Sequence, residues 1–321
     1  GKAIAPAFVD THQHFASLST FNAGLNVMEA ESNDEIAGMI GEYAAQTKDK
    51  TIIAFGASPH SVIEGRLITR EEIDAVCLGK EVMVVKYDGH ACIVSTPLLK
   101  KLDKKLSRLR GYHPDTGEMN QEAFFAVSDY MSSSLSIPEL LKCTVDAQHD
   151  LFAEGLTSVQ TDDFKYAPEG KSYDLMDGLM ALSRSGQLKL RIAEQALLTD
   201  QASLDEFFAR GGASYGASDR FRISTVKILA DGSLGARTAY MQVPYADAPD
   251  TVGLPIYENQ QELNDLVLTS HLHNMPTAIH VIGDGAAQMS LDAIEYAQKA
   301  APWHNPRHGL VHCQIMTQPQ L

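Results

Sequence analysis

The residues of this sequence that could do chemistry are histidines and one lysine near the ends of predicted strands. His12 and His14 lie two residues apart in the short β-rich run 7–14. Side chains two apart in a strand leave the same face, so both imidazoles can reach one cation. Histidines with this spacing also occur by chance, and the pair alone is therefore weak evidence for a metal site.

Two further histidines each end a predicted strand. His280 follows the apolar residues 277–279, and His312 follows residues 310–311. At the carboxyl ends of barrel strands, such imidazoles converge on the barrel mouth. Taken singly, each is better explained as a core histidine with satisfied hydrogen bonds, but together with His12 and His14 they favour a shared site.

A second histidine pair with the same spacing receives a different interpretation. His271 and His273 fall within the predicted helix 262–273. Residues two apart on a helix do not share a face. We therefore expect a solvated helix end here and no metal site.

Lys227 lies within the apolar strand 223–229. Burying a charged amine there would be costly. Neutralised by burial, the amine could react with carbon dioxide and give a carbamate that bridges two cations. The predicted ligands of a binuclear site are therefore His12, His14, Lys227, His280 and His312.

The elements that must position these residues alternate regularly in the second half of the chain. The pattern predicts helices over 138–154, 172–185, 203–210 and 284–299, and strands over 157–160, 188–194, 222–229, 277–280 and 309–312. Strands alternating with helices of this length predict an α/β fold with a parallel sheet, and a run of them predicts a (β/α) barrel.

The segment 48–136 has a different organisation. Its apolar runs 51–55 and 82–85 are separated by a capping box, Thr69-x-x-Glu72. A turn-rich stretch follows at 111–117. We expect a separate small α/β unit here.

Composition excludes several classes of partner. The 321 residues carry a net charge of −15, which repels nucleic acid and anionic lipid. No run approaches the ~18 apolar residues of a membrane span, and the four cysteines form no CxxC pair. These features favour a cytoplasmic protein acting on a small-molecule substrate, as a monomer or a homodimer.

Several motifs together resemble the amidohydrolase superfamily. Residues 6–14 are similar to its opening strand, and residues 226–235 to the lysine strand of a branch that includes N-substituted formamide deformylases. Further motifs occur at residues 87–90, 155–159, 279–284 and 312–314. The set extends across nearly the whole chain.

This resemblance implies a ligand arrangement and a fold. His12 and His14 would bind one metal, His280 and His312 the other, and carbamylated Lys227 would bridge them. The fold would be a TIM-type barrel of residues 1–47 and 137–321, truncated after about strand six. The small α/β subdomain 48–136 would be inserted near its active-site mouth.

The resemblance also implies a function. We expect a metal-dependent hydrolase of C–N, amide-like bonds, in which two divalent cations, zinc by preference, activate a hydroxide near the catalytic residues Lys227, His280 and His312. The aspartate that the family carries on its eighth strand does not occur in this sequence, so we expect the isolated chain to be inactive. The alternatives are a mononuclear-metal deaminase, with Lys227 a spectator, and a non-catalytic metal- or ligand-binding barrel.

Three residues are candidates for substrate binding. His90 follows a predicted strand, although a simple turn histidine explains it equally well. Asp231 and Arg237 lie in the glycine-rich loop after the lysine strand and could orient substrate or pair with each other. Asp284 begins a predicted helix, where we expect it to act as the helix N-cap.

Overall fold

The computed structural model describes residues 5–87, 89, 91–133, 135–167, 170–235 and 237–321. Contacts divide the chain into two compact units. One comprises Gly1–Phe15, Asp150–Lys165 and Tyr173–Leu321, and the other comprises Ala16–His149 and Tyr166–Ser172. Each unit is built around its own sheet.

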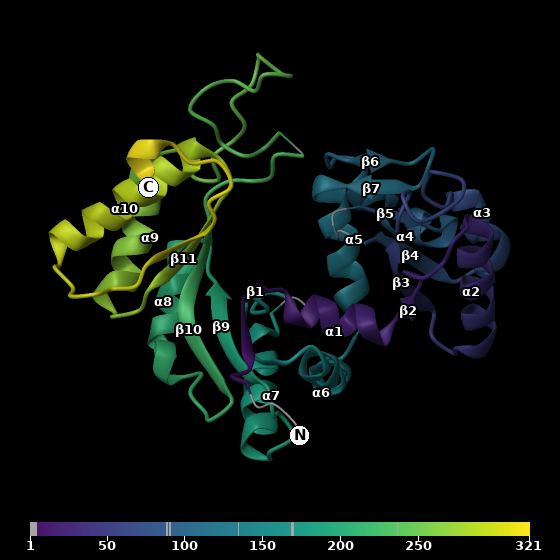
Figure 1. Ribbon diagram of the computed structural model, residues 1–321, viewed down its shortest axis with the longest axis horizontal. Coiled ribbons are helices and arrows are strands. Elements are labelled where there is room, and N and C mark those ends of the chain that lie inside the picture. Colours follow the sequence, from purple (N-terminus) through teal and green to yellow (C-terminus); the bar gives the residue numbers. More distant parts are fainter. Residues whose placement is uncertain (1–4, 88, 90, 134, 168–169, 236) are drawn as a thin grey trace. The chain divides into compact units, whose positions relative to one another are not determined.

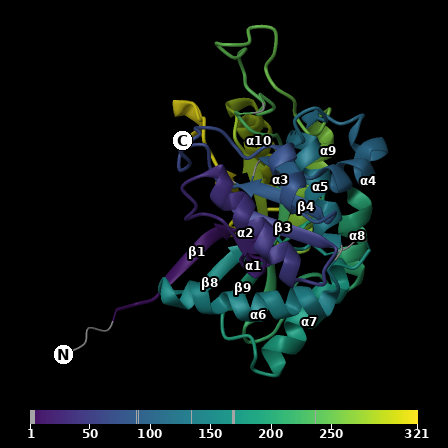
Figure 2. The same cartoon turned by 90° about the vertical axis from the view of Figure 1, so that its right-hand side faces the viewer.

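The first unit contains a six-stranded sheet in which every neighbouring pair is parallel. Figure 2 shows β1, β8 and β9 lying next to one another in it. The strands, in spatial order, are β1 (Phe8–Gln13), β8 (Leu156–Thr161), β9 (Arg191–Leu197), β10 (Phe221–Leu229), β11 (Thr277–Val281) and β12 (Gly309–His312).

Helices connect these strands, as the sequence pattern predicts. They are α7 (Ser172–Arg184), α8 (Gln201–Ala209), α9 (Gln260–Leu272) and α10 (Asp284–Ala300), with short 3₁₀ turns η1 (Gly212–Ser214) and η2 (Gln318–Gln320). In Figure 1, α9 and α10 pack side by side next to β11. Helix α7 buries Leu175, Met176, Leu179 and Met180, whose spacing places them on one face.

The sheet curls strongly. Strands β1 and β12 are its two edges, yet the rings of His12 and His312 lie only 4.9 Å apart, centroid to centroid. The six strands therefore form a nearly closed parallel barrel flanked by helices. A complete TIM barrel has eight strands, so the architecture agrees with the expected incomplete TIM-type barrel.

A long connection leaves the barrel after β10. Residues 230–259, in green in Figure 1, contain no helix or strand at any described position and lead to α9. An isolated bridge between Tyr245 and Ala248 closes one turn within this loop. Asp231, discussed below, lies at its start.

The second unit contains a mixed six-stranded sheet. Its strands, in spatial order, are β2 (Leu25–Asn26), β3 (Thr51–Ala57), β4 (Glu81–Lys86), β5 (Ala91–Val94), β7 (Glu118–Asn120) and β6 (Tyr112–His113). The remaining helices are α1 (Phe15–Ala23), α2 (Asn33–Gln46), α3 (Arg70–Val76), α4 (Thr96–Leu106), α5 (Gln121–Ser133) and α6 (Ile137–Ala153).

This second sheet draws in residues from before position 48. Strand β2 pairs with β3, and Ile36 and Ile40 of α2 share a buried core with Ile52 and Val82. Helix α2 thus packs on this sheet. The domain boundaries expected from the sequence, and a position of residues 48–136 near the barrel mouth, stay predictions.

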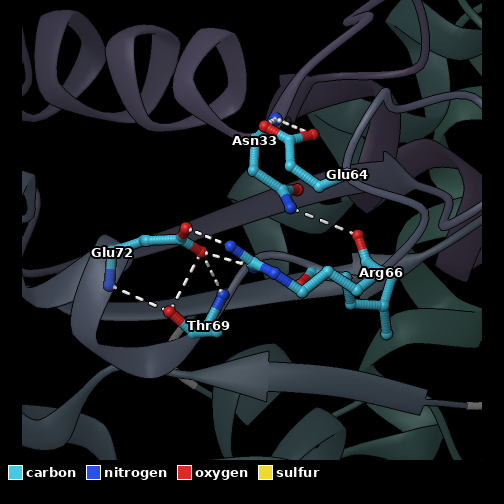
Figure 3. A network of polar contacts seen from close by, with 6 residues as sticks. Asn33, Glu64, Arg66, Thr69 and Glu72 are labelled. Atoms are coloured by element: carbon cyan, nitrogen blue, oxygen red, sulfur yellow. Dashed lines mark hydrogen bonds and ion pairs between the residues drawn. The ribbon is translucent and has the colours of Figure 1, made fainter.

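A polar network near the start of α2 and α3 shows how local sequence signals shape this unit (Figure 3). The capping box predicted at Thr69 is complete, because the Thr69 hydroxyl accepts from Glu72 N–H while the Glu72 carboxylate accepts from Thr69 N–H. Arg66 adds two hydrogen bonds to the same carboxylate, 2.9 and 2.6 Å long. Glu64 accepts from Asn33 N–H at the start of α2.

Within the described part of the chain, no helix combines the length and the apolar character that crossing a bilayer requires.

Candidate metal centre

His12 and His14 come from the carboxyl end of β1. Their rings lie 5.3 Å apart, and the ring of His12 also contacts that of His312, 4.9 Å away. The rings of His312 and His280 are 4.8 Å apart. The four predicted histidines therefore form a continuous series of ring contacts in the order His14, His12, His312, His280.

Strand register explains why these residues meet. Leu229 pairs with His280, and Val281 pairs with His312, so the histidines lie near the carboxyl ends of neighbouring parallel strands. Gln13 pairs with Thr161, which places His14 beside the end of β8. Parallel strands in a barrel present their carboxyl ends at one mouth.

Lys227 is buried in β10 and is only 1% exposed. Its Nζ lies 3.1 Å from Asp162 Oδ2, and the other oxygen of that carboxylate lies 2.5 Å from His14 Nδ1. Asp162 thus joins the lysine to the histidine series. In this structure the Lys227 charge is balanced by Asp162, so carbamylation would first require release of the amine from this ion pair.

Asp162 is a member of the cluster that the sequence did not predict. It follows β8 directly, at the same barrel end as the other residues, and its side chain is 7% exposed. Burial is the strongest single effect and opposes ionisation, but the hydrogen bond to His14 and the charges of His14 and Lys227 together hold the pKa of Asp162 well below its usual range. The available signal was an acidic residue two positions after the predicted barrel strand 157–160.

The imidazoles differ in their pKa values. Burial, followed by the charge of Lys227, lowers the pKa of His12 to about 4. Partial desolvation, followed by the charges of His280 and Lys227, lowers the pKa of His312. His12 and His312 are therefore neutral near pH 7, which is the form that binds metals, whereas the hydrogen bond to Asp162 raises the pKa of His14.

The donor chemistry fits a divalent cation. His12 Nδ1 is buried and has no hydrogen-bond partner among the described residues, and imidazole is a common ligand of zinc. No three His, Cys, Asp or Glu side chains of the described residues already stand in an arrangement that could hold a metal ion. Binding at this cluster would thus involve side-chain rotation.

A sequence model of the amidohydrolase family matches residues 1–321. The chain belongs to the amidohydrolase family. The branch of N-substituted formamide deformylases, to which the lysine strand is similar, stays a prediction.

Curated relatives of this chain are distant in sequence but match along nearly its whole length. The protein LONG AFTER FAR-RED 3 of Arabidopsis thaliana is 24% identical, with 99% of this chain and 59% of the relative aligned. The putative amidohydrolase YtcJ of Bacillus subtilis is 26% identical, with 98% and 59% aligned. The chain thus spans about three fifths of the length of these relatives.

Two solved structures are similar in fold. An uncharacterized metal-dependent hydrolase from Pyrococcus horikoshii superposes with a TM-score of 0.70 at 26% identity, covering 90% of this chain and 56% of that one. A corresponding protein from Pyrococcus furiosus gives 0.70 at 25% identity, covering 91% and 58%.

The three substrate-binding candidates have different surroundings in the structure. Asp231 is buried and lies 3.2 Å from His280 Nδ1 through its Oδ1. Arg237 is exposed and pairs with Asp247 at 2.9 Å, so the expected alternative of an Asp231–Arg237 pair is wrong. His90 lies outside the described residues.

The expectations that His271 is solvated and that Asp284 is a helix N-cap were wrong. His271 is 3% exposed, because its ring packs against His308 and Trp303 and is not solvated. Helix α10 takes Gly283 as its N-cap without a side-chain cap, whereas the Asp284 carboxylate accepts from Gln242 N–H in the long loop. His273 is exposed, as expected, and stacks on Phe208.

A second acidic residue lies deep in the barrel wall. Glu194 of β9 is fully buried and pairs in register with Thr161 of β8. Burial above all, and then the charges of Asp163 and Asp162, raises the pKa of Glu194 well above its ordinary value. Burial therefore opposes ionisation of the Glu194 carboxyl group.

Proposed function

We propose that this chain is the metal-binding barrel of a hydrolase that cleaves C–N, amide-like bonds with the help of two divalent zinc ions. The observation that carries the proposal is the cluster of four histidine rings joined through Asp162 to the buried Lys227. The family, and the description of the two Pyrococcus proteins as metal-dependent hydrolases, support it.

The residues that would hold the ions are His12, His14, Lys227, His280 and His312. A bound divalent cation supplies Lewis acidity and lowers the pKa of water, which makes a hydroxide nucleophile available near neutral pH. The low pKa values of His12 and His312 keep their imidazoles unprotonated and ready to donate a lone pair.

Lys227 would take part only after a chemical change. Its ammonium group must lose one proton to become a nucleophilic amine. The amine nitrogen then forms a bond to the carbon of carbon dioxide, and a second proton leaves. The product is an anionic carbamate, whose two oxygens can bridge two cations. Asp162, which balances the ammonium in this structure, would then face an anion, and bound cations would offset this repulsion.

The Lys227–Asp162 ion pair also favours a second candidate, a deaminase with one metal ion in which Lys227 remains an ammonium. The two functions differ in metal stoichiometry. Substrate contacts by His90, Asp231 and Arg237, a cytoplasmic location and a homodimeric state stay predictions, as does inactivity of the isolated chain.

The experiment uses the full-length protein that carries this sequence. Elemental analysis after zinc loading should give two equivalents per chain, and hydrolysis of N-formyl amines should disappear on chelation and return with zinc. Lys227→Ala should lower both metal content and turnover, and short carboxylic acids should partly restore them. Lys299→Ala, which removes an exposed lysine of α10, serves as the matched control.

One tightly bound zinc together with unchanged turnover in Lys227→Ala would support the mononuclear alternative. Two zinc ions and normal turnover in that variant would contradict the bridging role of Lys227. Metal binding without turnover of any amide-like substrate would favour a non-catalytic barrel.

A further inference from the structure

Helices α2 and α4 pack on opposite faces of the mixed sheet in the second unit. Side chains along a strand alternate between its two faces. Val82 and Val84 of β4 share a buried core with Ile36 of α2, whereas Met83 of the same strand shares a second core with Leu98 of α4. The outer sides of the two helices are therefore exposed on opposite sides of this unit.

The exposed side of α4 is basic. Residues 96–110 contain six lysines and arginines and a single acidic residue, Asp103. Lys100, Lys101 and Lys104 are exposed, and their spacing of three and four residues places them on one side of the helix, away from its buried leucines. We call these three lysines the basic face. Among the described residues, none forms an ion pair with them.

The exposed side of α2 is acidic. Residues 29–46 contain five acidic residues and no lysine or arginine. Asp34 and Glu42, which we call the acidic face, are exposed on the same side of the helix as Gly38, which lies four residues from each. A Cβ on Gly38 would meet no atom within 4 Å. No bulky side chain therefore stands between the two charges of the acidic face.

Stabilisation of the helices themselves explains only some of these charges. Acidic residues in the first turn and basic residues in the last turn interact favourably with the helix dipole, and the effect fades beyond one turn. Asp34 is in the first turn of α2, and Lys104 is in the last turn of α4. Lys100 and Lys101 precede that last turn, and Glu42 lies beyond that first turn, so the helix dipoles do not explain them.

We propose that the basic face of α4 binds the acidic face of α2 in a second copy of this protein. An extended polyanion, such as an anionic membrane, would also meet the acidic remainder of a chain whose net charge is −15. A single acidic helix face is small enough to contact the basic face alone.

This contact is heterologous, because the two faces differ and lie on opposite sides of one unit. Each copy uses one face for one neighbour and leaves the other face for the next, which gives rings or open chains. None of these residues belongs to the metal centre, so the inference does not depend on the proposed function.

The first test is sedimentation velocity on the wild-type, full-length protein. In about 0.01 M salt, we expect the weight-average mass to rise with protein concentration up to about 1 mM. In about 1 M salt the screening length is only about 3 Å, so this rise should be largely lost. A mass that does not depend on concentration in low salt would overturn the proposal, and so would equal association in high salt.

The second test exchanges the charges of the two faces. One variant combines Lys100→Glu, Lys101→Glu and Lys104→Glu, so that both faces are acidic. The other combines Asp34→Lys and Glu42→Lys, so that both faces are basic. Each variant, shown to be folded by circular dichroism, should self-associate at least about 10-fold more weakly than the wild type. An equimolar mixture should regain association, because opposite charges then face each other again.

The control variant replaces three exposed lysines of other segments by glutamate, which changes the net charge as much as the basic-face variant does. They are Lys142, Lys171 and Lys299. This control should associate nearly like the wild type. Equal weakening in the control, or a mixture of the two face variants that associates no better than either alone, would overturn the proposal. Binding of the wild type to phosphatidylserine vesicles without self-association would also overturn it.

Discussion

The rings of His12 and His312 lie 4.9 Å apart although their strands form the two opposite edges of the six-stranded sheet. Only a strongly curled sheet can bring its edges together in this way. The curvature therefore does two things at once: it nearly closes the barrel, and it joins a ligand candidate from the start of the chain to one from its end.

The Asp162–Lys227 pair should matter for stability as well as for chemistry. Asp162→Asn leaves the buried Lys227 without a counter-charge, and removing one partner of a buried ion pair typically costs about 3–5 kcal/mol. Denaturant unfolding of the metal-free protein measures this loss. The exposed pair of Lys142 with Asp146 offers the control, because Asp146→Asn should cost less than about 1 kcal/mol. Equal effects of the two variants would show that the Lys227 contact is unimportant.

For Glu194, in contrast to Asp162, we predict that replacing the carboxyl group does not destabilise the protein at neutral pH. Its pKa is raised in the folded protein, mainly by burial, so the folded chain keeps this proton to a higher pH than the unfolded chain does. Stability should therefore fall as pH rises above about 4.5, the ordinary value. Glu194→Gln needs no proton, so it should be at least as stable as the wild type at pH 7 and should lose this pH dependence. A large loss of stability at pH 7 in Glu194→Gln would mean that the carboxylate is ionised in the fold.

The contact between buried His271 and half-buried His308 predicts acid sensitivity. Thr277 N–H donates to His308 Nδ1 at 3.0 Å, so His308 must donate through Nε2 to His271 Nδ1, 2.9 Å away, and His271 Nε2–H is left for Ala301 O. In this arrangement each ring carries one proton. Burial, followed by repulsion from the positive charge that a protonated His271 would carry, lowers the pKa of His308 to about 4.

The sign of this effect follows from the unfolded chain, in which His308 has its ordinary pKa of 6.5 and takes up a proton first. Stability should decline as pH falls from 6.5 to about 4 and show no further effect of this group below that. His308→Asn, whose side-chain oxygen can still accept from Thr277, should flatten the decline in thermal unfolding experiments. An unchanged slope in that variant would assign the acid sensitivity to other groups.

The positions of the histidines at strand ends could be predicted from the sequence alone. His280 and His312 follow short apolar runs. The alternation of strands with helices predicted a parallel barrel, in which both residues would lie at the carboxyl ends of the strands. The strand that ends at His312 was predicted with its observed bounds, Gly309–His312. Residues 188–190, by contrast, were predicted to belong to a strand that begins only at Arg191. Leu188 and Leu190 precede this strand but are buried, so their apolar side chains cannot be told apart from strand residues in the sequence pattern.

Contacts between distant segments could not be predicted. Asp162 is recognisable as important only once His14 and Lys227, which lie far away in the sequence, are seen on either side of it. His271 looked like a solvated helix end because its partner, His308, comes from a loop 37 residues later. Asp231 was singled out as a loop residue near substrate, whereas it is buried and accepts from Tyr240 N–H of its own loop and from the N–H groups of Ile282 and Gly283 after β11.

We propose above all that His12, His14, Lys227, His280 and His312 surround a site for divalent cations. Anomalous X-ray diffraction at the zinc absorption edge, from crystals of the full-length protein loaded with zinc, locates such ions. We expect strong anomalous peaks among these side chains, with imidazole nitrogens about 2.0–2.1 Å away. Strong peaks elsewhere in the molecule and none within this cluster would contradict it.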